Sequence, residues 1–275
     1  MLIVDSQVHI WGADTPERPW PKRAPPQRPV PLSADDLLSE MNAAGVDRVV
    51  IVPPSWEGDR NDLALAAAKA HPNRFAIMGR LDPESPASRG QIAGWLKQPG
   101  MLGLRFNFNT PVLLPLLTEG HMDWIWGEAE KYGMPLYVLV SHANVHLIDT
   151  VAERHPRLKL VMDHMALTHG KDDEAFRDFD KVLAIAKRPN VAAKISALPC
   201  FSTDKYPYRR LHPYIRKAYD AFGPGRLFWG TDLSRSPISY RQQVTLFTEE
   251  LPWLTGQDLD SVMGGGVCEW LGWKV

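Results

Sequence analysis

Two histidines and one aspartate carry the clearest chemistry in this sequence: His9, His164 and Asp232. Each follows a short apolar run, so each is expected where a buried strand ends. An ionised carboxylate that is hydrogen-bonded to an imidazole can take a proton from water as the water attacks a carbonyl, and can then return that proton to the leaving atom. Three such protein ligands plus a water are also a common arrangement around catalytic zinc. The residue types therefore point to hydrolysis, with or without a metal.

A single histidine at a strand end is more often a hydrogen-bonded structural residue than a catalyst, because imidazole pairs readily with backbone groups. The convergence of two histidines and an aspartate is harder to explain in this way. In a (β/α)8 barrel, catalytic groups project from the carboxyl ends of several strands. Gln7 and His9 would share one side of the first strand, since side chains alternate along a strand. The predicted site thus depends on a fold that brings these strand ends together.

The elements that must position these residues alternate along the chain. Short runs rich in Val, Ile, Leu and Phe are typical of parallel strands, and longer segments of helical period separate them. The predicted strands are 2–10, 48–52, 75–79, 102–106, 136–140, 158–163, 191–195 and 227–230. The predicted helices are 33–44, 61–70, 122–132, 145–155, 173–187, 214–222 and 240–251. This order predicts one α/β domain over residues 1–275, a TIM (β/α)8 barrel, with a doubly wound open sheet as the alternative.

The segment 11–31 is rich in proline and is predicted to be a long loop after the first strand. Proline lacks an N–H donor and restricts the residue before it, so this segment cannot form a helix. In a barrel, the loop after a strand lies over the mouth. We expect the segment to form a rim or lid there, and an inert surface loop is the alternative.

Composition limits the partners. The net charge is -1, with 31 basic and 32 acidic residues, whereas nucleic acid or an anionic membrane would call for a basic excess. The 2 cysteines are too few for a disulfide framework or a thiolate metal cage. There is no apolar run of membrane-spanning length, and the N-terminus lacks the features of a signal peptide. We expect a cytoplasmic protein with a small-molecule substrate, and a homo-oligomer is left open.

Four motifs carry a resemblance: VDSQVHIW from residue 4, GLRFNF from residue 103, VMDHM from residue 161 and FWGTD from residue 228. In this order they resemble the amidohydrolase superfamily, within it the amidohydrolase-related (amidohydrolase 2) branch that includes 2-pyrone-4,6-dicarboxylate lactonase and sugar lactonases. The resemblance implies a metal-dependent-hydrolase-like barrel. It also implies a hydrolytic water activated by Asp232 beside His164. His9 would either polarise the carbonyl or hold a metal that does so.

Gln7 departs from the His-x-His start that is usual in this family. An amide is a poor zinc ligand compared with imidazole, although a metal held by His9, His164 and Asp232 alone is chemically feasible. Some members of the branch hydrolyse lactones without a metal. The sequence therefore favours a metal-free reaction in which Gln7 hydrogen-bonds the substrate or water, with one divalent metal such as zinc as the alternative.

Substrate contacts follow from the same resemblance. Arg105 stands where the lactonase pattern places an arginine that binds a substrate carboxylate. A guanidinium group is suited to this because it can donate two parallel hydrogen bonds to a carboxylate. The alternative is that Arg105 forms a salt bridge on the rim of the barrel. The dicarboxylate lactonase pattern has two further arginines and a tyrosine where this chain has Pro111, Leu167 and Leu139, so 2-pyrone-4,6-dicarboxylate is not the expected substrate. Further predicted contacts are Ser55, His142 and Arg235, with Lys194 and Ser196 in the polar lining and Trp11, Trp20 and Trp56 as apolar walls.

The leading interpretation is a hydrolase that opens a small carboxylated lactone, or a related cyclic ester or amide, in catabolism. Asp232 is the general base in this interpretation. A decarboxylase or hydratase of the same superfamily is the second, because the fold does not fix the reaction. The third is a barrel that has lost catalysis and binds a ligand, which Gln7 and the missing arginines suggest.

Overall fold

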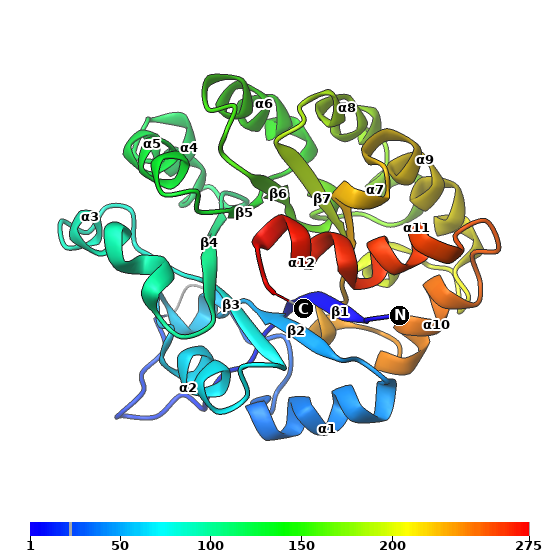
Figure 1. The fold of residues 1–275 in the computed structure, drawn as a ribbon, viewed down its shortest axis with the longest axis horizontal. Coiled ribbons are helices and arrows are strands. Elements are labelled where there is room, and N and C mark those ends of the chain that lie inside the picture. The colour runs from blue at the N-terminus through cyan, green and yellow to red at the C-terminus, as the bar shows by residue number, and fades with distance from the viewer. Residues whose placement is uncertain (22–23, 275) are drawn as a thin grey trace.

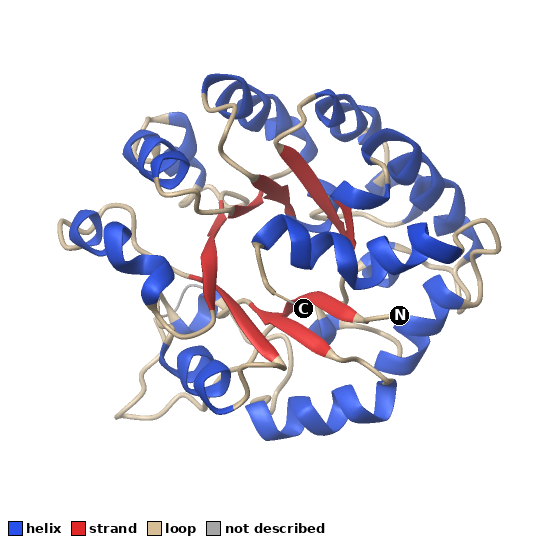
Figure 2. Cartoon of the chain, viewed as in Figure 1, coloured by secondary structure: helices blue, strands red, loops and turns tan. Residues whose placement is uncertain are grey.

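Eight parallel strands form one sheet in the computed structural model, which describes residues 1–21 and 24–274. The strands are paired in sequence order, and Figures 1 and 2 show them curving into a ring with helices around the outside. They are β1 (Val4–Val8), β2 (Arg48–Ile51), β3 (Phe75–Gly79), β4 (Met101–Asn107), β5 (Leu136–Leu139), β6 (Leu160–Met162), β7 (Val191–Ile195) and β8 (Leu227–Trp229). The predicted TIM barrel is confirmed, as a ring that is nearly closed.

Most of the helices link consecutive strands and cover the outside of the ring. They are α1 (Ala34–Ala44), α2 (Asp62–Ala70), α3 (Ser88–Gln91), α4 (Leu114–Thr118), α5 (Asp123–Lys131), α6 (Val145–Arg154), α7 (Asp172–Ala175), α8 (Phe179–Ala184), α9 (His212–Phe222), α10 (Tyr240–Thr248), α11 (Gly256–Asp260) and α12 (Gly266–Leu271). The prediction of one helix over 173–187 was wrong. The chain leaves the helical conformation at Phe176, whose ring stacks on Tyr214 of α9 with centroids 3.8 Å apart.

Helix α1 shows how local sequence sets these boundaries. Its N-cap is Ser33, whose side chain accepts from the backbone N–H of Asp36 while the Asp36 carboxylate reaches back to Ser33. Gly45 ends the helix with a φ of 77°, a left-handed conformation that glycine adopts without steric cost. Between these ends, Leu37 and Met41 face the core and are fully buried. The capped helix therefore returns the chain to the ring at β2.

The interior of the ring is apolar where the strands begin. A buried layer there comprises Val4, Val50, Met78, Tyr137, Val161, Ala192 and Phe228, and α12 packs Val267, Cys268 and Leu271 against it. Lys159, the residue before β6, donates to the Trp270 carbonyl of α12 at 2.9 Å, which places this helix at the starting end of the strands. Figure 1 shows α12 lying across that end. With one end of the barrel covered by a helix, a ligand has the carboxyl ends of the strands as its route to the interior.

The seam between β8 and β1 is held by side chains. In the described part of the chain, the strand ladders join β1 to β8 in order and include no β8–β1 pair. The Asp5 carboxylate accepts from the Thr231 backbone at 2.9 Å, from the Thr231 hydroxyl, and from the Tyr240 hydroxyl at 2.9 Å. Just beyond, the Asp232 N–H donates to the Gln7 carbonyl at 2.9 Å. These bonds fix the start of the segment that carries Asp232.

The Pro-rich loop reaches the carboxyl end of β8. Arg28 donates to the Leu233 carbonyl at 3.2 Å, and Gln27 accepts from the Ser234 hydroxyl. These contacts place the described part of the loop beside the residues that follow Asp232, while positions 22–23 of the predicted loop lie outside the described residues. None of the helices in the described ranges is long and apolar enough to cross a membrane.

Candidate active site

The backbone turns sharply where β6, β7 and β8 end. Three consecutive residues after β6, His164, Met165 and Ala166, have φ values of 52°, 54° and 56°. Ala197 after β7 has a φ of 58°, and Asp232 after β8 has a φ of 51°. A non-glycine residue in this left-handed region costs about 1–3 kcal/mol, and such strain gathers at functional sites. Two of the predicted catalytic residues, His164 and Asp232, are thus held in a costly backbone conformation at the ends of β6 and β8, the two strands that flank β7.

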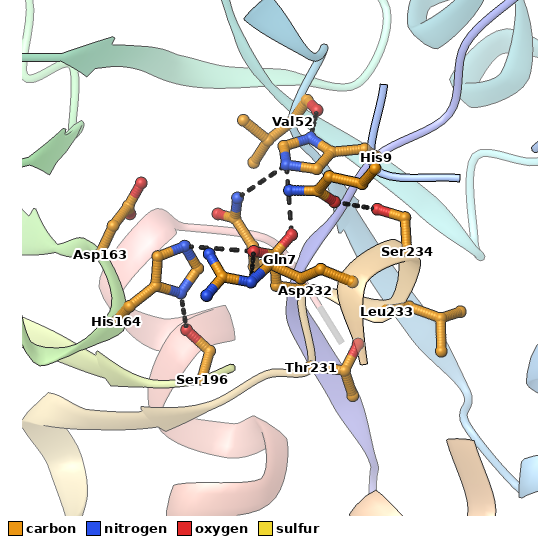
Figure 3. Close-up of polar contacts among 12 residues, drawn as sticks. Gln7, His9, Val52, Asp163, His164, Ser196, Thr231, Asp232, Leu233 and Ser234 are labelled. Carbon is orange, nitrogen blue, oxygen red and sulfur yellow. Dashed lines mark hydrogen bonds and ion pairs between the residues drawn. The ribbon is translucent and has the colours of Figure 1, made fainter. Parts of the chain in front are cut away.

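The three predicted catalytic side chains meet at this end of the barrel (Figure 3). Asp232 Oδ1 lies 3.3 Å from His9 Nε2, and Asp232 Oδ2 lies 3.6 Å from His164 Nε2. The far nitrogens are also engaged, with His9 Nδ1 2.5 Å from the Val52 carbonyl and His164 Nδ1 2.8 Å from the Ser196 hydroxyl. Each imidazole is therefore fixed through Nδ1 and turns Nε2 toward the carboxylate.

The acid–base state of the cluster suits proton transfer. Burial alone would raise the pKa of Asp232, but its contact with His9 and the charges of His164 and Arg235 outweigh burial and hold that pKa below its ordinary value. Arg235 Nε is 3.6 Å from Asp232 Oδ2. Burial lowers the pKa of His164 to about 4, although Asp232 and Asp163 oppose it. At neutral pH, an ionised carboxylate therefore stands beside a neutral imidazole.

A buried charged network lies next to this cluster, deeper in the barrel. Lys194 Nζ is 2.5 Å from Asp163 Oδ1, and Arg105 Nε donates to Asp163 Oδ2 at 2.9 Å. Lys194 also donates to Gln7 Oε1 and lies 3.7 Å from the centre of the Tyr137 ring. Burial would raise the pKa of Asp163, but Lys194 and Arg105 lower it to about 2, so the carboxylate is ionised. The sequence predicted Lys194 only as part of the lining and did not predict its pairing with Asp163.

Of the two roles considered for Arg105, the salt bridge is observed, and the binding of a substrate carboxylate stays a prediction. The salt bridge exists, but inside the barrel, where the Arg105 side chain is 6% exposed, and not on an exposed rim. Among the described residues, Nε is the guanidinium atom that makes a hydrogen bond. Its two terminal nitrogens are left for a further partner, which fits bidentate binding of a carboxylate.

The remaining predicted contacts lie around the cluster. The Trp56 ring packs edge-on against His9 at 5.6 Å, and Trp11 packs against Trp56 at 5.2 Å, so these two form an apolar wall. Ser55 opens a 3-10 turn beside Trp56. His142 Nε2 is 3.1 Å from the Met165 carbonyl. Within the described ranges, neither Ser55 nor His142 contacts the His9–His164–Asp232 cluster, and their substrate contacts stay predictions.

The donor set does not fit a catalytic metal. Within residues 1–21 and 24–274, no group of three or more His, Cys, Asp or Glu side chains is placed to hold a metal ion. Lys194 can only donate, so Gln7 must present its oxygen to Lys194 and its NH2 toward His9, with 3.5 Å between Gln7 Nε2 and His9 Nε2. An amide NH2 is a donor and does not coordinate cations. The reaction proposed below therefore uses only side chains of this protein and water.

The fold and this cluster define a hydrolase-type barrel with its reactive groups at the carboxyl ends of the strands. The amidohydrolase family model matches residues 4–265, which is most of the chain. This protein belongs to the amidohydrolase family, and the resemblance seen in the four sequence motifs is confirmed.

Two curated relatives are lactone hydrolases by name. The chain is 26% identical over 239 residues to L-fucono-1,5-lactonase from Burkholderia ambifaria, covering 83% of this chain and 79% of that protein. It is also 26% identical over 238 residues to 4-sulfomuconolactone hydrolase from Hydrogenophaga intermedia, covering 84% of this chain and 74% of that protein. Family membership and these relatives agree with the interpretation of the chain as an enzyme.

Solved structures share the fold at lower identity. An amidohydrolase from Burkholderia multivorans, solved with bound zinc, has a TM-score of 0.83 and 20% identity, with 99% of each chain covered. A 5-carboxyvanillate decarboxylase from Sphingomonas paucimobilis has a TM-score of 0.67 and 18% identity, covering 98% of this chain and 99% of that chain. The shared architecture therefore includes a decarboxylase, and the reaction has to be argued from the site.

Proposed function

We propose that this protein is a lactonase that opens a small carboxylated lactone by attack of water, with Asp232 as the general base. The observation that carries the proposal is the placement of an ionised, buried carboxylate between two imidazole nitrogens at 3.3 and 3.6 Å. Asp232 Oδ1 is buried against His9, whereas Oδ2 lies 3.6 Å from both His164 Nε2 and Arg235 Nε and accepts no hydrogen bond within the described residues, so Oδ2 is the acceptor left for a proton from water. A general base needs this combination of charge and an open oxygen.

The reaction then runs in two steps. Asp232 removes a proton from water as the water oxygen forms a bond to the lactone carbonyl carbon, and neutral His164 holds the water by a hydrogen bond. The tetrahedral intermediate breaks its bond to the ring oxygen, and the Asp232 carboxyl gives its proton to that oxygen. The product is an open-chain hydroxy acid. His9 lies beside Oδ1 of Asp232 and, with Gln7, flanks the position of the carbonyl.

Charge balance supports an anionic substrate. The site holds the cations Arg105, Lys194 and Arg235 against the carboxylates Asp163 and Asp232, which leaves one positive charge in excess. The Arg235 side chain is 32% exposed, so the excess positive charge is partly solvated and favours an anionic substrate by attraction at the mouth of the site. Arg105 is the proposed partner of this carboxylate because its terminal nitrogens face no other acceptor in the described residues.

The test is ring opening of paired lactones, one with a carboxylate and one with a neutral group of the same size, measured by acid release. We expect the wild-type protein to prefer the carboxylated lactone, and the Arg105→Met variant to raise KM for that lactone about 10–100-fold while leaving KM for the neutral one unchanged. Equal losses with both lactones would contradict carboxylate binding by Arg105.

The same assay separates the two other interpretations. Release of carbon dioxide from a carboxylated substrate without ring opening would favour the decarboxylase, and tight binding of a lactone that is recovered unchanged would favour a barrel without catalysis. A single domain, a cytoplasmic location and a homo-oligomer stay predictions from the sequence.

A further inference from the structure

We propose that Lys194 is a positioning residue that presents the amide of Gln7 as the hydrogen-bond donor to the substrate's carbonyl oxygen. The inference rests on the lactone hydrolysis proposed above and names the group that stabilises the negative charge on that oxygen. Such donors usually supply a large part of the rate in acyl transfer reactions. Gln7 would then be a catalytic residue, and Lys194 would act through it.

The ammonium group of Lys194 is held in place by three neighbouring groups. Its ammonium lies between Gln7 Oε1, Asp163 Oδ1 at 2.5 Å and the face of the Tyr137 ring at 3.7 Å. Lys194 and Gln7 are both fully buried. Burial lowers the pKa of Lys194 to about 8, opposed by Asp163, so the ammonium is charged at neutral pH. A buried cation held in this way cannot change partners without breaking an ion pair.

This arrangement decides which way the Gln7 amide faces. An ammonium has donors and no acceptor, so the Gln7 oxygen must point to Lys194 and the NH2 must point away from it. Figure 3 shows the amide next to His9, and Gln7 Nε2 is 3.5 Å from His9 Nε2. His9 Nδ1 donates to the Val52 carbonyl, because a carbonyl oxygen only accepts, and Nε2 is therefore the ring nitrogen left to accept one of the two N–H groups of Gln7.

Because Gln7 is fully buried, the substrate can contact its amide only when the neighbouring side chains move on binding. The second N–H of Gln7 makes no hydrogen bond within the described residues. It lies in the cluster where Asp232 activates water, so it is placed for the carbonyl oxygen of the same substrate. The hydrogen bond from the Lys194 ammonium polarises the amide, and linked hydrogen bonds strengthen each other. By polarising the Gln7 amide, the positive charge of Lys194 makes the amide N–H a stronger hydrogen-bond donor at the reaction centre.

Lys194 has a second route to the substrate that must be separated from this one. It pairs with Asp163, which in turn pairs with Arg105, the proposed carboxylate partner. A change at Lys194 that acts through Arg105 would alter substrate binding and appear in KM. A change that acts through Gln7 would alter stabilisation of the transition state and appear in kcat.

The first test is Gln7→Glu, which keeps the length of the side chain and an acceptor for Lys194 but removes the NH2. We expect kcat to fall about 100-fold with KM changed only a few-fold. Arg105→Met is the control on the side of the substrate carboxylate and should raise KM more than it lowers kcat. Wild-type kcat in a folded Gln7→Glu variant would overturn the proposal.

The second test is Lys194→Met in the wild-type protein and in a Gln7→Met background. If Lys194 acts through Gln7, its substitution lowers kcat at least 10-fold in the first background and has little further effect in the second. Equal kcat losses in the two backgrounds would overturn the proposal. Thermal unfolding of each variant shows whether it is folded, and Asp163 keeps Arg105 as a partner when Lys194 is replaced.

An NMR measurement separates this proposal from the lactonase proposal, because it needs no turnover. The side-chain NH2 signal of Gln7 is assigned by its loss in Gln7→Met. We expect Lys194→Met to shift this signal and speed its exchange with solvent, and the surface substitution Lys181→Met to leave it unchanged. An unaltered Gln7 signal in Lys194→Met would refute the positioning role even if the enzyme opens lactones. If no lactone is opened but the signal responds as expected, the positioning of Gln7 stands and the lactonase proposal fails.

Discussion

Asp5 and Asp232 are two buried carboxylates at the same seam of the barrel, with opposite surroundings. Asp5 accepts hydrogen bonds on both oxygens, from two backbone N–H groups and two hydroxyls, those of Gln7, Thr231 and Tyr240. Asp232 faces two imidazoles and the Arg235 guanidinium, and its Oδ2 accepts no hydrogen bond in the described residues. One carboxylate is saturated and the other has an open oxygen.

The pKa shifts of the two groups follow from these partners. Burial raises the pKa of Asp5 to about 6, because its neutral donors offset the loss of solvent only in part. At Asp232 burial is outweighed by His9, His164 and Arg235, and the pKa is lowered. A saturated carboxylate is suited to holding the seam together, and an ionised one with an open oxygen is suited to taking a proton. The type of hydrogen-bonding partner, more than the extent of burial, therefore distinguishes Asp5, the structural carboxylate, from Asp232, the proposed base.

The largest effect is expected for Asp232→Asn. The change removes the proton acceptor and keeps the size of the side chain, so kcat for lactone opening should fall about 1,000-fold while the unfolding temperature stays close to that of the wild type. Asp180→Asn, a change at an exposed aspartate of α8, is the control and should leave kcat unchanged. Near-normal turnover in Asp232→Asn would show that Asp232 is not the general base and that the two carboxylates do not differ in this respect.

Asp5→Ala should show the opposite pattern. It leaves the buried N–H groups of Gln7 and Thr231 without an acceptor, so the free energy of unfolding should fall by about 3 kcal/mol, measured by denaturant titration. Well below the unfolding temperature, kcat should stay within 10-fold of the wild-type value. A loss of kcat as large as that of Asp232→Asn would mean that the seam carboxylate also acts in the reaction.

The pH dependence of stability sharpens the same contrast. Asp5 has a pKa of about 6 in the folded protein against 3.8 for a solvent-exposed aspartate, so the folded state holds this proton more tightly. Stability from this group is fully present below about pH 4 and is lost as pH rises through 6, by about 3 kcal/mol. Asp5→Asn should lack this loss, because an amide does not titrate in this pH range. Identical pH profiles of unfolding in the two proteins would contradict the raised pKa.

The smallest effect is expected for Ser196→Ala. The serine hydroxyl is 2.8 Å from His164 Nδ1 and touches neither Asp232 nor the proposed water in the described structure. Loss of one hydrogen bond that orients the imidazole should lower kcat about 3–10-fold and leave KM unchanged. A loss of 100-fold or more would show that His164 depends on Ser196 for more than orientation.

Much of the barrel could be predicted because its strands are short apolar runs of β-branched residues. The predicted strands 75–79 and 191–195 match β3 and β7 in both bounds. The histidines and the aspartate could be selected because they end such runs, and the barrel fold places strand ends together. The four motifs then identified the family, which agrees with the match over residues 4–265.

The details of the site depend on contacts that no local pattern encodes. Lys194 lies on the same side of β7 as Ala192, since side chains alternate along a strand, but the sequence does not show that this side faces the interior, nor that Asp163 lies opposite. The bond from Arg105 to Asp163 joins residues 58 apart, and the bond from Thr231 to Asp5 joins residues 226 apart. The left-handed backbone at His164 and Asp232 has no signal either, because glycine usually marks that conformation.

The most direct test of Asp232 as the base is a crystal structure of Asp232→Asn with an intact carboxylated lactone bound. We expect this crystal structure to show the substrate carboxylate bound to Arg105, and a water that contacts both His164 and residue 232. That water should lie about 3–3.5 Å from the lactone carbonyl carbon. Asp232 would not be the general base if the lactone binds in the barrel mouth with its carbonyl turned away from residue 232 and with no water between them.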